Sequence, residues 1–210
     1  MIRHRLCCLL LALPLAACSS LLNVQRTPFT IYAPQLAVPT TEPATGAVDW
    51  QLAVETPLAS DALDTVRIVV MPSPGVIEVF PGARWRDAAP AMLRSLVVQG
   101  FQDSRRIVGV GSTVSGLHAD YALGIDLRDF QLEMQDGAPR TVIRFQAKLL
   151  DYTTNRVLAT QSFAEAVAAA GTDAASAFAA FEAALNRVIP TLVDWTLREG
   201  ERAHGRDAGG

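Results

Sequence analysis

The chain has 210 residues, of which 50% are hydrophobic and 19% are charged, so it can bury one sizeable core and is not disordered throughout. Its formal net charge is −3, and its 18 basic residues, all but one of them arginine, are scattered along the sequence. A nucleic-acid partner would require a stripe of basic residues on one face, so the composition argues against nucleic-acid binding.

The first 17 residues have the pattern of a bacterial signal peptide. Arg3 and Arg5 precede an apolar run over residues 6–17, and this run is too short for a membrane-spanning helix, which needs about twenty residues. The run ends in Leu-Ala-Ala-Cys at residues 15–18, which matches the lipobox of bacterial lipoprotein precursors. We therefore expect cleavage before Cys18 and acylation of its thiol. The alternative is an ordinary secretory leader that happens to contain this cysteine.

The cysteines and the residue after Cys18 extend this expectation. Cys7 and Cys8 lie in the leader, so a chain cleaved before Cys18 keeps a single thiol and has no internal disulfide. Two or more acyl chains hold a protein firmly at a bilayer. Ser19 stands where an aspartate would retain a lipoprotein at the inner membrane. We therefore expect the periplasmic face of the outer membrane of a Gram-negative cell.

The rest of the chain divides into a tether, one domain and a tail. Residues 18–46 carry the lipidated cysteine and are rich in proline, threonine and alanine, which predicts a flexible tether. The apolar residues within 29–32 could add a short edge strand. Residues 47–198 form the predicted domain. Residues 199–210 are polar and contain several glycines, which predicts a disordered tail.

The first part of the domain contains four predicted strands and one helix. The strands are expected at residues 50–54, at 66–71 ending before Pro72, at 76–80 ending before Pro81, and at 107–110. The residue pattern between the last two predicts a helix, with Asp87 as its N-cap and Pro90 in its first turn. We expect this helix to end near Phe101.

The clearest strand signal follows in the second half. Residues 121–127 place alternate apolar side chains on one face, and residues 130–134 continue with the phase slipped by one. This slip predicts a β-bulge near Arg128 and Asp129.

Two turns are predicted to fold this strand into a three-strand meander in the middle of the sheet. Asp136-Gly137 is a hairpin signal, and Asn155 in the second turn can adopt a left-handed conformation. The third strand is expected over residues 157–167. A long amphipathic helix should then begin at Thr172 or Asp173 and be kinked or restarted by a later proline.

Together these patterns predict an α+β fold. It consists of a mixed, mainly antiparallel β-sheet with a C-terminal three-strand meander, packed by two amphipathic helices on one face.

The sequence shows no convincing catalytic or metal site. His118 lies beside Asp120, with Ser112 and Ser115 nearby, but a loop histidine at the start of a strand explains this pattern better than a hydrolase does. Nucleophile elbows, phosphate-binding loops and metal-ligand spacings are not found. The pair Asp126/Asp129 is typical of solvated carboxylates at a strand edge. We expect no enzyme activity, no metal and no cofactor other than the covalent lipid.

Residues 81–85, Pro-Gly-Ala-Arg-Trp, are the most distinctive internal segment. An arginine and a tryptophan in a loop ahead of a helix could form a binding hot spot, which makes Arg84 and Trp85 candidate partner-binding residues. Equally, Trp85 could close the end of the core while Arg84 pairs with an acidic neighbour.

The order of these features resembles the ABC-type transport auxiliary lipoproteins. These include the paraquat-inducible protein C group, which accompanies mammalian-cell-entry (MCE) domain lipid transporters. In that family an aromatic-Pro-x-Ala-Arg-Trp stretch precedes the first helix, as residues 80–85 do here. Residues 119–121 opening a strand, residues 147–151 and 156–159 around a turn, and the helix reaching Trp195 continue the resemblance.

The resemblance covers roughly residues 1–198 and departs from the family at two places. Asn155 stands where a glycine is common, and residues 58–65 are short and divergent. It implies a non-enzymatic component of a machine that moves lipids between the inner and outer membranes. ATP hydrolysis would belong to another subunit, and an MCE-domain protein would be the partner; direct lipid binding by the domain is left open.

Three other functions are compatible with the sequence. A lipoprotein activator of peptidoglycan synthesis, or an outer-membrane assembly factor, would also combine a tether with a small α+β domain. A tether of this length spans only about 30 Å as a random coil, which favours a partner near the membrane. A hydrolase built around His118 is the third alternative.

Overall fold

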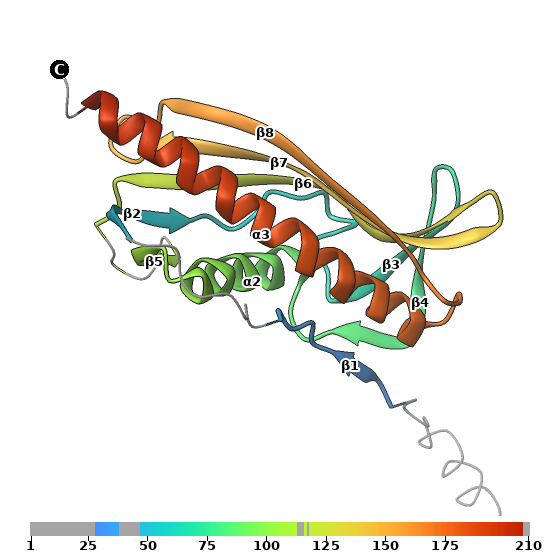
Figure 1. Ribbon diagram of the computed structural model, residues 1–210. Coiled ribbons are helices and arrows are strands. Elements are labelled where there is room, and N and C mark those ends of the chain that lie inside the picture. Colours follow the sequence, from blue (N-terminus) through green and yellow to red (C-terminus); the bar gives the residue numbers. More distant parts are fainter. Residues whose placement is uncertain (1–27, 38–46, 113–115, 117, 208–210) are drawn as a thin grey trace, which may run out of the picture.

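The computed structural model describes residues 28–37, 47–112, 116 and 118–207, which form one sheet with two helices on one of its faces (Figure 1). The elements are β1 Thr30–Tyr32, β2 Val48–Val54, β3 Arg67–Ser73, β4 Val76–Trp85, α2 Ala89–Ser104, β5 Ile107–Ser112, β6 Tyr121–Gln135, β7 Ala138–Asp151, β8 Val157–Ala168 and α3 Ala174–Asp207. The predicted α+β class is confirmed. The predicted signal peptide and Cys18 lie outside the described residues.

β6 joins the two parts of the sheet. One of its edges pairs with β7 in an antiparallel ladder along the whole strand, and β7 pairs in turn with β8. The other edge pairs in parallel with β2 at Tyr121–Leu123 and with β3 at Gln131–Glu133. Between these two ladders, the chain leaving β2 forms an isolated bridge from Leu58 to Asp126. The divergent segment after Leu58 therefore connects two strands that lie on the same edge of β6.

The meander β6–β7–β8 is present, but it occupies one side of the sheet and not its middle. The remaining strands continue from β6 in the order β3, β4, β1 on one path and β2, β5 on the other. β8 pairs only with β7 and so forms an edge. Antiparallel pairing dominates by length, because the two meander ladders are the longest in the sheet. The early strands add shorter, mostly parallel pairings, which sequence periodicity cannot reveal.

Three local predictions in the meander are confirmed. The register of β6 against β7 shifts between Leu127 and Asp129, which is the predicted bulge. Asp136 and Gly137 both have positive φ and connect the paired residues Gln135 and Ala138, as expected for a two-residue hairpin turn. Asn155 has φ 54°, the left-handed conformation that the turn requires.

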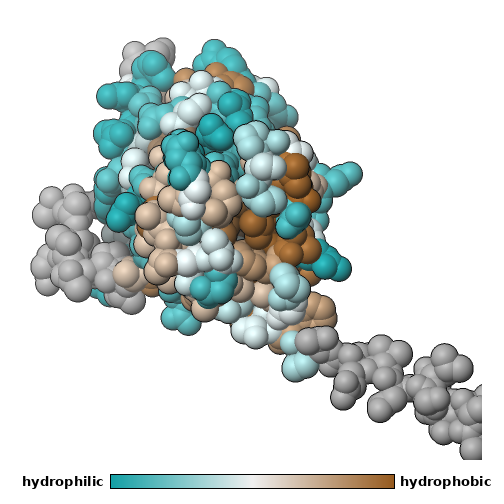
Figure 2. All heavy atoms as spheres, turned by 90° about the vertical axis from the view of Figure 1, so that its right-hand side faces the viewer, coloured by the Kyte–Doolittle hydropathy of each residue, from teal (hydrophilic) through white to brown (hydrophobic). Residues whose placement is uncertain are grey.

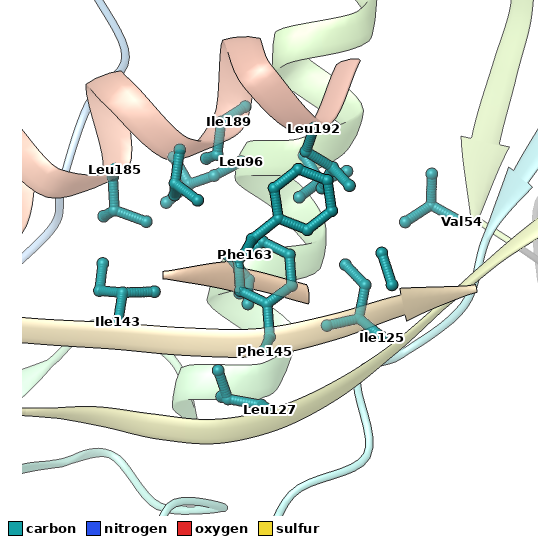
Figure 3. Close-up of a cluster of buried hydrophobic side chains, with 14 of the residues drawn as sticks. Val54, Leu96, Ile125, Leu127, Ile143, Phe145, Phe163, Leu185, Ile189 and Leu192 are labelled. Atoms are coloured by element: carbon teal, nitrogen blue, oxygen red, sulfur yellow. The ribbon is translucent and has the colours of Figure 1, made fainter. Parts of the chain in front are cut away.

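The core lies between the sheet and the two helices. α3 crosses the meander diagonally, while α2 lies over β5 and β2 (Figure 1). Figure 3 shows the centre of this layer, where side chains from strands and both helices meet: Val54, Leu96, Ile125, Leu127, Ile143, Phe145, Phe163, Leu185, Ile189 and Leu192. Full burial of one such side chain contributes about 1.5–3 kcal/mol, so this layer is the main source of stability.

α2 begins after Ala88 and not after Asp87, which corrects the predicted N-cap. The Ala88 position makes no side-chain capping bond, and Pro90 occupies the first turn, where a missing N–H does no harm. The Asp87 carboxylate instead pairs with the guanidinium of Arg86 at 3.0 Å. The helix also runs past Phe101 to Ser104.

β4 continues through Pro81 and Gly82, whereas the sequence predicted a loop there. Residues 80–83 of β4 lie opposite Ile68 alone, so the segment forms a wide irregularity within the ladder to β3. Gly82 has φ 66°, a left-handed conformation that residues with a side chain rarely adopt. β4 bends along its length (Figure 1). Arg84 and Trp85 therefore lie in a strand. β3 likewise includes Pro72 and ends at Ser73.

α3 continues to Asp207, which contradicts the disordered tail predicted from residue 199. The indole nitrogen of Trp50 donates a hydrogen bond to Glu201 at 2.9 Å, and Ala203 is buried. Gly200 lets the Trp50 ring approach the helix backbone, since a Cβ at this position would lie 2.3 Å from the ring. The helix also runs through Pro190 without restarting.

Residues 28–37 are part of the folded domain, which corrects the predicted flexible tether over this stretch. The edge strand foreseen within 29–32 is confirmed as β1, which pairs in parallel with β4. Beyond β1, the backbone N–H of Ala37 donates to the Asn186 side-chain oxygen at 2.7 Å, and the Asn186 amide donates back to Gln35 at 3.2 Å. The sequence could not show these contacts because their partners lie in α3.

Candidate interaction surface on β1, β4 and β3

Trp85 lies in the core, with 1% of its surface exposed. Its ring packs edge-on against Phe130 at 5.7 Å and against Phe181 at 5.0 Å between ring centroids. Of the two roles that the sequence left open for Trp85, the structure shows the core role. The indole is not available to a partner in this fold.

Arg84 points the opposite way, because successive side chains of a strand alternate between its faces. It is exposed, and its guanidinium lies 5.5 Å from the centre of the Phe29 ring. In the parallel ladder between β1 and β4, Arg84 is the partner of Ile31. Phe29 and Ile31 are 56% and 53% exposed. Arg84 therefore lies beside two exposed apolar side chains, one in β1 and one directly before it.

A second arginine completes this surface. Arg67 of β3 is exposed and is the direct partner of Arg84 in the antiparallel ladder between β3 and β4. Directly opposed residues share a face of the sheet. We call Phe29, Ile31, Arg67 and Arg84 the outer patch, because they lie on the face of the sheet opposite the buried Trp85.

The end of the molecule that carries the outer patch exposes further apolar surface. Val76 and Ile77, at the tip of the β3–β4 hairpin, are 43% and 53% exposed. Figure 2 looks onto this end and shows hydrophobic residues gathered on one half of it. Sequence reasoning singled out Arg84 but missed Arg67 and Phe29. Only the pairing of β1, β4 and β3 brings the three together.

Of the predicted catalytic candidates, Ser112 ends β5, and His118 and Asp120 lie just before β6. His118 is exposed, and Asp120 accepts a hydrogen bond from the backbone N–H of Gln51 at 2.7 Å. Ser115 lies outside the described residues. The Asp120 carboxylate therefore helps to hold the start of β6 against β2.

Asp126 and Asp129 take part in ion pairs across β6 and β7. Asp126 pairs with Lys148 at 2.6 Å, and Asp129 pairs with Arg144 at 2.6 Å. The hydrogen bond that Arg144 donates to Asp129, together with the negative charge of that carboxylate, raises the pKa of Arg144. Both carboxylates are thus structural partners of basic residues, and each such partly exposed pair contributes at most about 1 kcal/mol.

Neither a metal-binding cluster nor a membrane-spanning helix occurs among the described residues. No group of three or more His, Cys, Asp or Glu side chains that could hold a metal ion is found among them. Within the same residues, no helix is both long enough and apolar enough to span a bilayer.

Comparison with known proteins adds the family. The family model for the ABC-type transport auxiliary lipoprotein component matches residues 32–192. The crystal structure of a protein from Xanthomonas campestris is 40% identical, with a TM-score of 0.78 over 84% of this chain and 99% of that one. An uncharacterized protein with 15% identity and a TM-score of 0.63 covers 80% of this chain and shares the fold.

A curated relative is longer. An uncharacterized protein of Bradyrhizobium diazoefficiens is 28% identical over 158 residues, which make up 74% of this chain but 41% of the relative. The family model covers the domain from the end of β1 into α3, so it includes the arginine of the outer patch on β4 and the core around Trp85. The chain therefore belongs to the family of ABC-type transport auxiliary lipoprotein components.

Proposed function

We propose that this chain is a non-enzymatic lipoprotein of the periplasmic face of the outer membrane, which assists an ABC transport system with an MCE-domain subunit in moving lipids between the two membranes. The family match supports the transport role. The lipobox at residues 15–18 supports the anchor. ATP hydrolysis and the lipid pathway would belong to other subunits.

The docking of residues 28–37 is the observation that carries this proposal, because it shortens the connection to the bilayer. Only residues 19–27 separate Cys18 from Pro28, the first described residue. Even fully extended, at up to about 3.6 Å per residue, this segment spans no more than about 35 Å. The domain would therefore stay beside the membrane. That geometry suits a component of a lipid-transfer machine and disfavours an activator that must reach synthases in the cell wall.

The proposal is tested by crosslinking and affinity purification of the acylated protein from native envelopes. We expect recovery of an MCE-domain protein, and a much weaker recovery with Cys18→Ala, which cannot be acylated. Recovery of a cell-wall synthase without any MCE-domain protein would favour the activator of peptidoglycan synthesis instead.

Lipidation has its own measurement. Labelled palmitate should enter the wild-type chain and not the Cys18→Ala chain. Equal labelling of the two would show that the anchor is elsewhere, whatever the transport partner proves to be.

A further inference from the structure

The outer patch combines two positive charges on β3 and β4 with two exposed apolar side chains, one in β1 and one directly before it. We infer that it is a membrane-contact surface: Phe29 and Ile31 enter the boundary of a bilayer while Arg67 and Arg84 bind the phosphates of its lipids. The inference rests on the proposed function, because the bilayer is the one to which Cys18 would hold the chain.

The arginines supply the first argument. Arg67 and Arg84 are direct cross-strand partners, and like charges in this position repel each other. Among the described residues, neither guanidinium takes part in an ion pair. An anion between the two side chains would relieve the repulsion. Guanidinium groups are well suited to phosphate, since they can donate two parallel hydrogen bonds to its oxygens.

The apolar side chains supply the second argument. Ile31 lies in β1 and Phe29 directly precedes this strand, and more than half of each side chain is exposed. Such side chains beside basic ones are typical of surfaces that lie in the interface of an anionic membrane, with the apolar groups among the acyl chains and the cations at the headgroups. The guanidinium carbon of Arg84 lies 5.5 Å from the centre of the Phe29 ring, and the long stem of an arginine lets its charge stay at the phosphate level.

The third argument is position. The outer patch begins at Phe29, directly after Pro28, where the described chain starts on its path from Cys18. A lipid on Cys18 would bring this end of the domain to the bilayer before any other. Once one contact holds the chain at the surface, even a weak second contact is favoured by its high effective concentration. The bilayer is therefore the occupant that both the chemistry and the connection favour.

The test uses the chain without residues 1–17 and with Cys18→Ser, which removes the apolar leader and the acylation and leaves the outer patch intact. Binding is measured by flotation with vesicles of phosphatidylethanolamine and phosphatidylglycerol, and with vesicles of phosphatidylcholine alone. We expect binding to the anionic vesicles that falls as salt is raised, and much weaker binding to the neutral ones. Because the lipid anchor is absent, this measurement is independent of acylation and of any transporter.

Variants of the outer patch locate the contact. Arg67→Gln and Arg84→Gln should each lower binding to anionic vesicles roughly fivefold, the expected effect of one basic residue near such a surface. Ile31→Ser should lower binding at every salt concentration, because it removes apolar contact and no charge.

Arg156→Gln and Val108→Ser are the matched controls, since both residues are exposed and lie outside the outer patch. They should bind as the parent does, and melting temperatures confirm that every variant folds. If the arginine variants bind vesicles like the controls, or if the parent does not bind at all, the membrane-contact surface is wrong. If the outer patch instead crosslinks to a protein in envelopes and no vesicle binding is found, it is a protein interface. Neither of these outcomes affects whether an MCE-domain protein co-purifies with the acylated chain. The proposed function is therefore tested independently.

Discussion

Arg84 and Trp85 are adjacent in the sequence, and their side chains lie on opposite faces of β4. The indole packs among Phe130, Phe178 and Phe181, whereas the guanidinium lies over Phe29 on the outside. A motif of this kind cannot be assigned one role from its composition. A substitution at Trp85 tests the fold, and a substitution at Arg84 tests the surface.

Trp85→Ala is expected to destabilise the domain by about 3–5 kcal/mol, because it leaves a large cavity in a core that cannot collapse fully. Chemical denaturation followed by circular dichroism measures this loss. Arg84→Gln is the matched control and should change the unfolding free energy by no more than about 0.5 kcal/mol. Equal effects from the two substitutions would contradict the burial of Trp85.

Asp173 caps the N-terminus of α3. It is one of the two residues, Thr172 and Asp173, at which the sequence predicted the helix to begin. Its carboxylate accepts hydrogen bonds from the Ser176 hydroxyl at 2.6 Å and from the backbone N–H groups of Ala175 and Ser176 at 3.0 Å. The hydroxyl bond, followed by the backbone bond of Ser176, lowers the pKa of Asp173 below its ordinary value of 3.8. A carboxyl group whose pKa is lower in the folded state than in the unfolded state stabilises the fold at pH values above its unfolded-state pKa.

This stabilisation is therefore complete at neutral pH and is lost as the pH falls below about 3.8 and through the folded-state pKa. Asp173→Ala should lower the melting temperature at pH 7, and the difference from wild type should shrink toward pH 3. Thermal unfolding over this pH range measures the effect. A difference that stays constant with pH would mean that the ionised carboxylate is not the cap.

At the scale of elements, the patterns that can be recognised in the sequence are those formed by neighbouring residues. The bulge near Asp129, the Asp136-Gly137 turn and the apolar stripe of α3 each depend on spacing within one or two elements. The wrong predictions for residues 28–37 and 199–207 both involve distant partners. Trp50 holds the end of α3, and Asn186 holds residues 35–37, across separations that no local pattern encodes.

Gly200→Ala tests the contact between β2 and α3. In an exposed helix this change would be stabilising by about 1 kcal/mol, because alanine is the better helix former. Here the new Cβ would meet the Trp50 ring, so we expect destabilisation by about 1–3 kcal/mol. Gly205→Ala is the matched control, since nothing lies within 4 Å of a Cβ there, and it should be neutral or stabilising. Urea denaturation of both variants measures whether each substitution raises or lowers the free energy of unfolding.

Asn186→Ala tests the docking of the segment after β1. The substitution removes the acceptor for the Ala37 N–H and the donor to the Gln35 carbonyl. Hydrogen exchange of residues 35–37 should become faster, while exchange in the β6–β7 ladder stays unchanged. Uniformly faster exchange throughout the domain would show that Asn186 supports the global fold and not this local contact.

At the scale of the whole molecule, the outer patch and β5 lie at different ends of the sheet (Figure 1). The proposed anchor would bring β1 to the bilayer. The β2–β5 end, where Val108 is 86% exposed, would then point away from it. Under the proposed function, this arrangement would leave one end of the domain for the membrane and the other for a transport partner.

The most direct measurement of this account is site-specific photocrosslinking of the acylated protein in native envelopes, with the probe at position 31 or at position 108. We expect the probe at 31 to form adducts with lipid, and the probe at 108 to capture an MCE-domain protein. Capture of no MCE-domain protein at either position, with lipid adducts formed equally at both, would contradict both the orientation and the transport role.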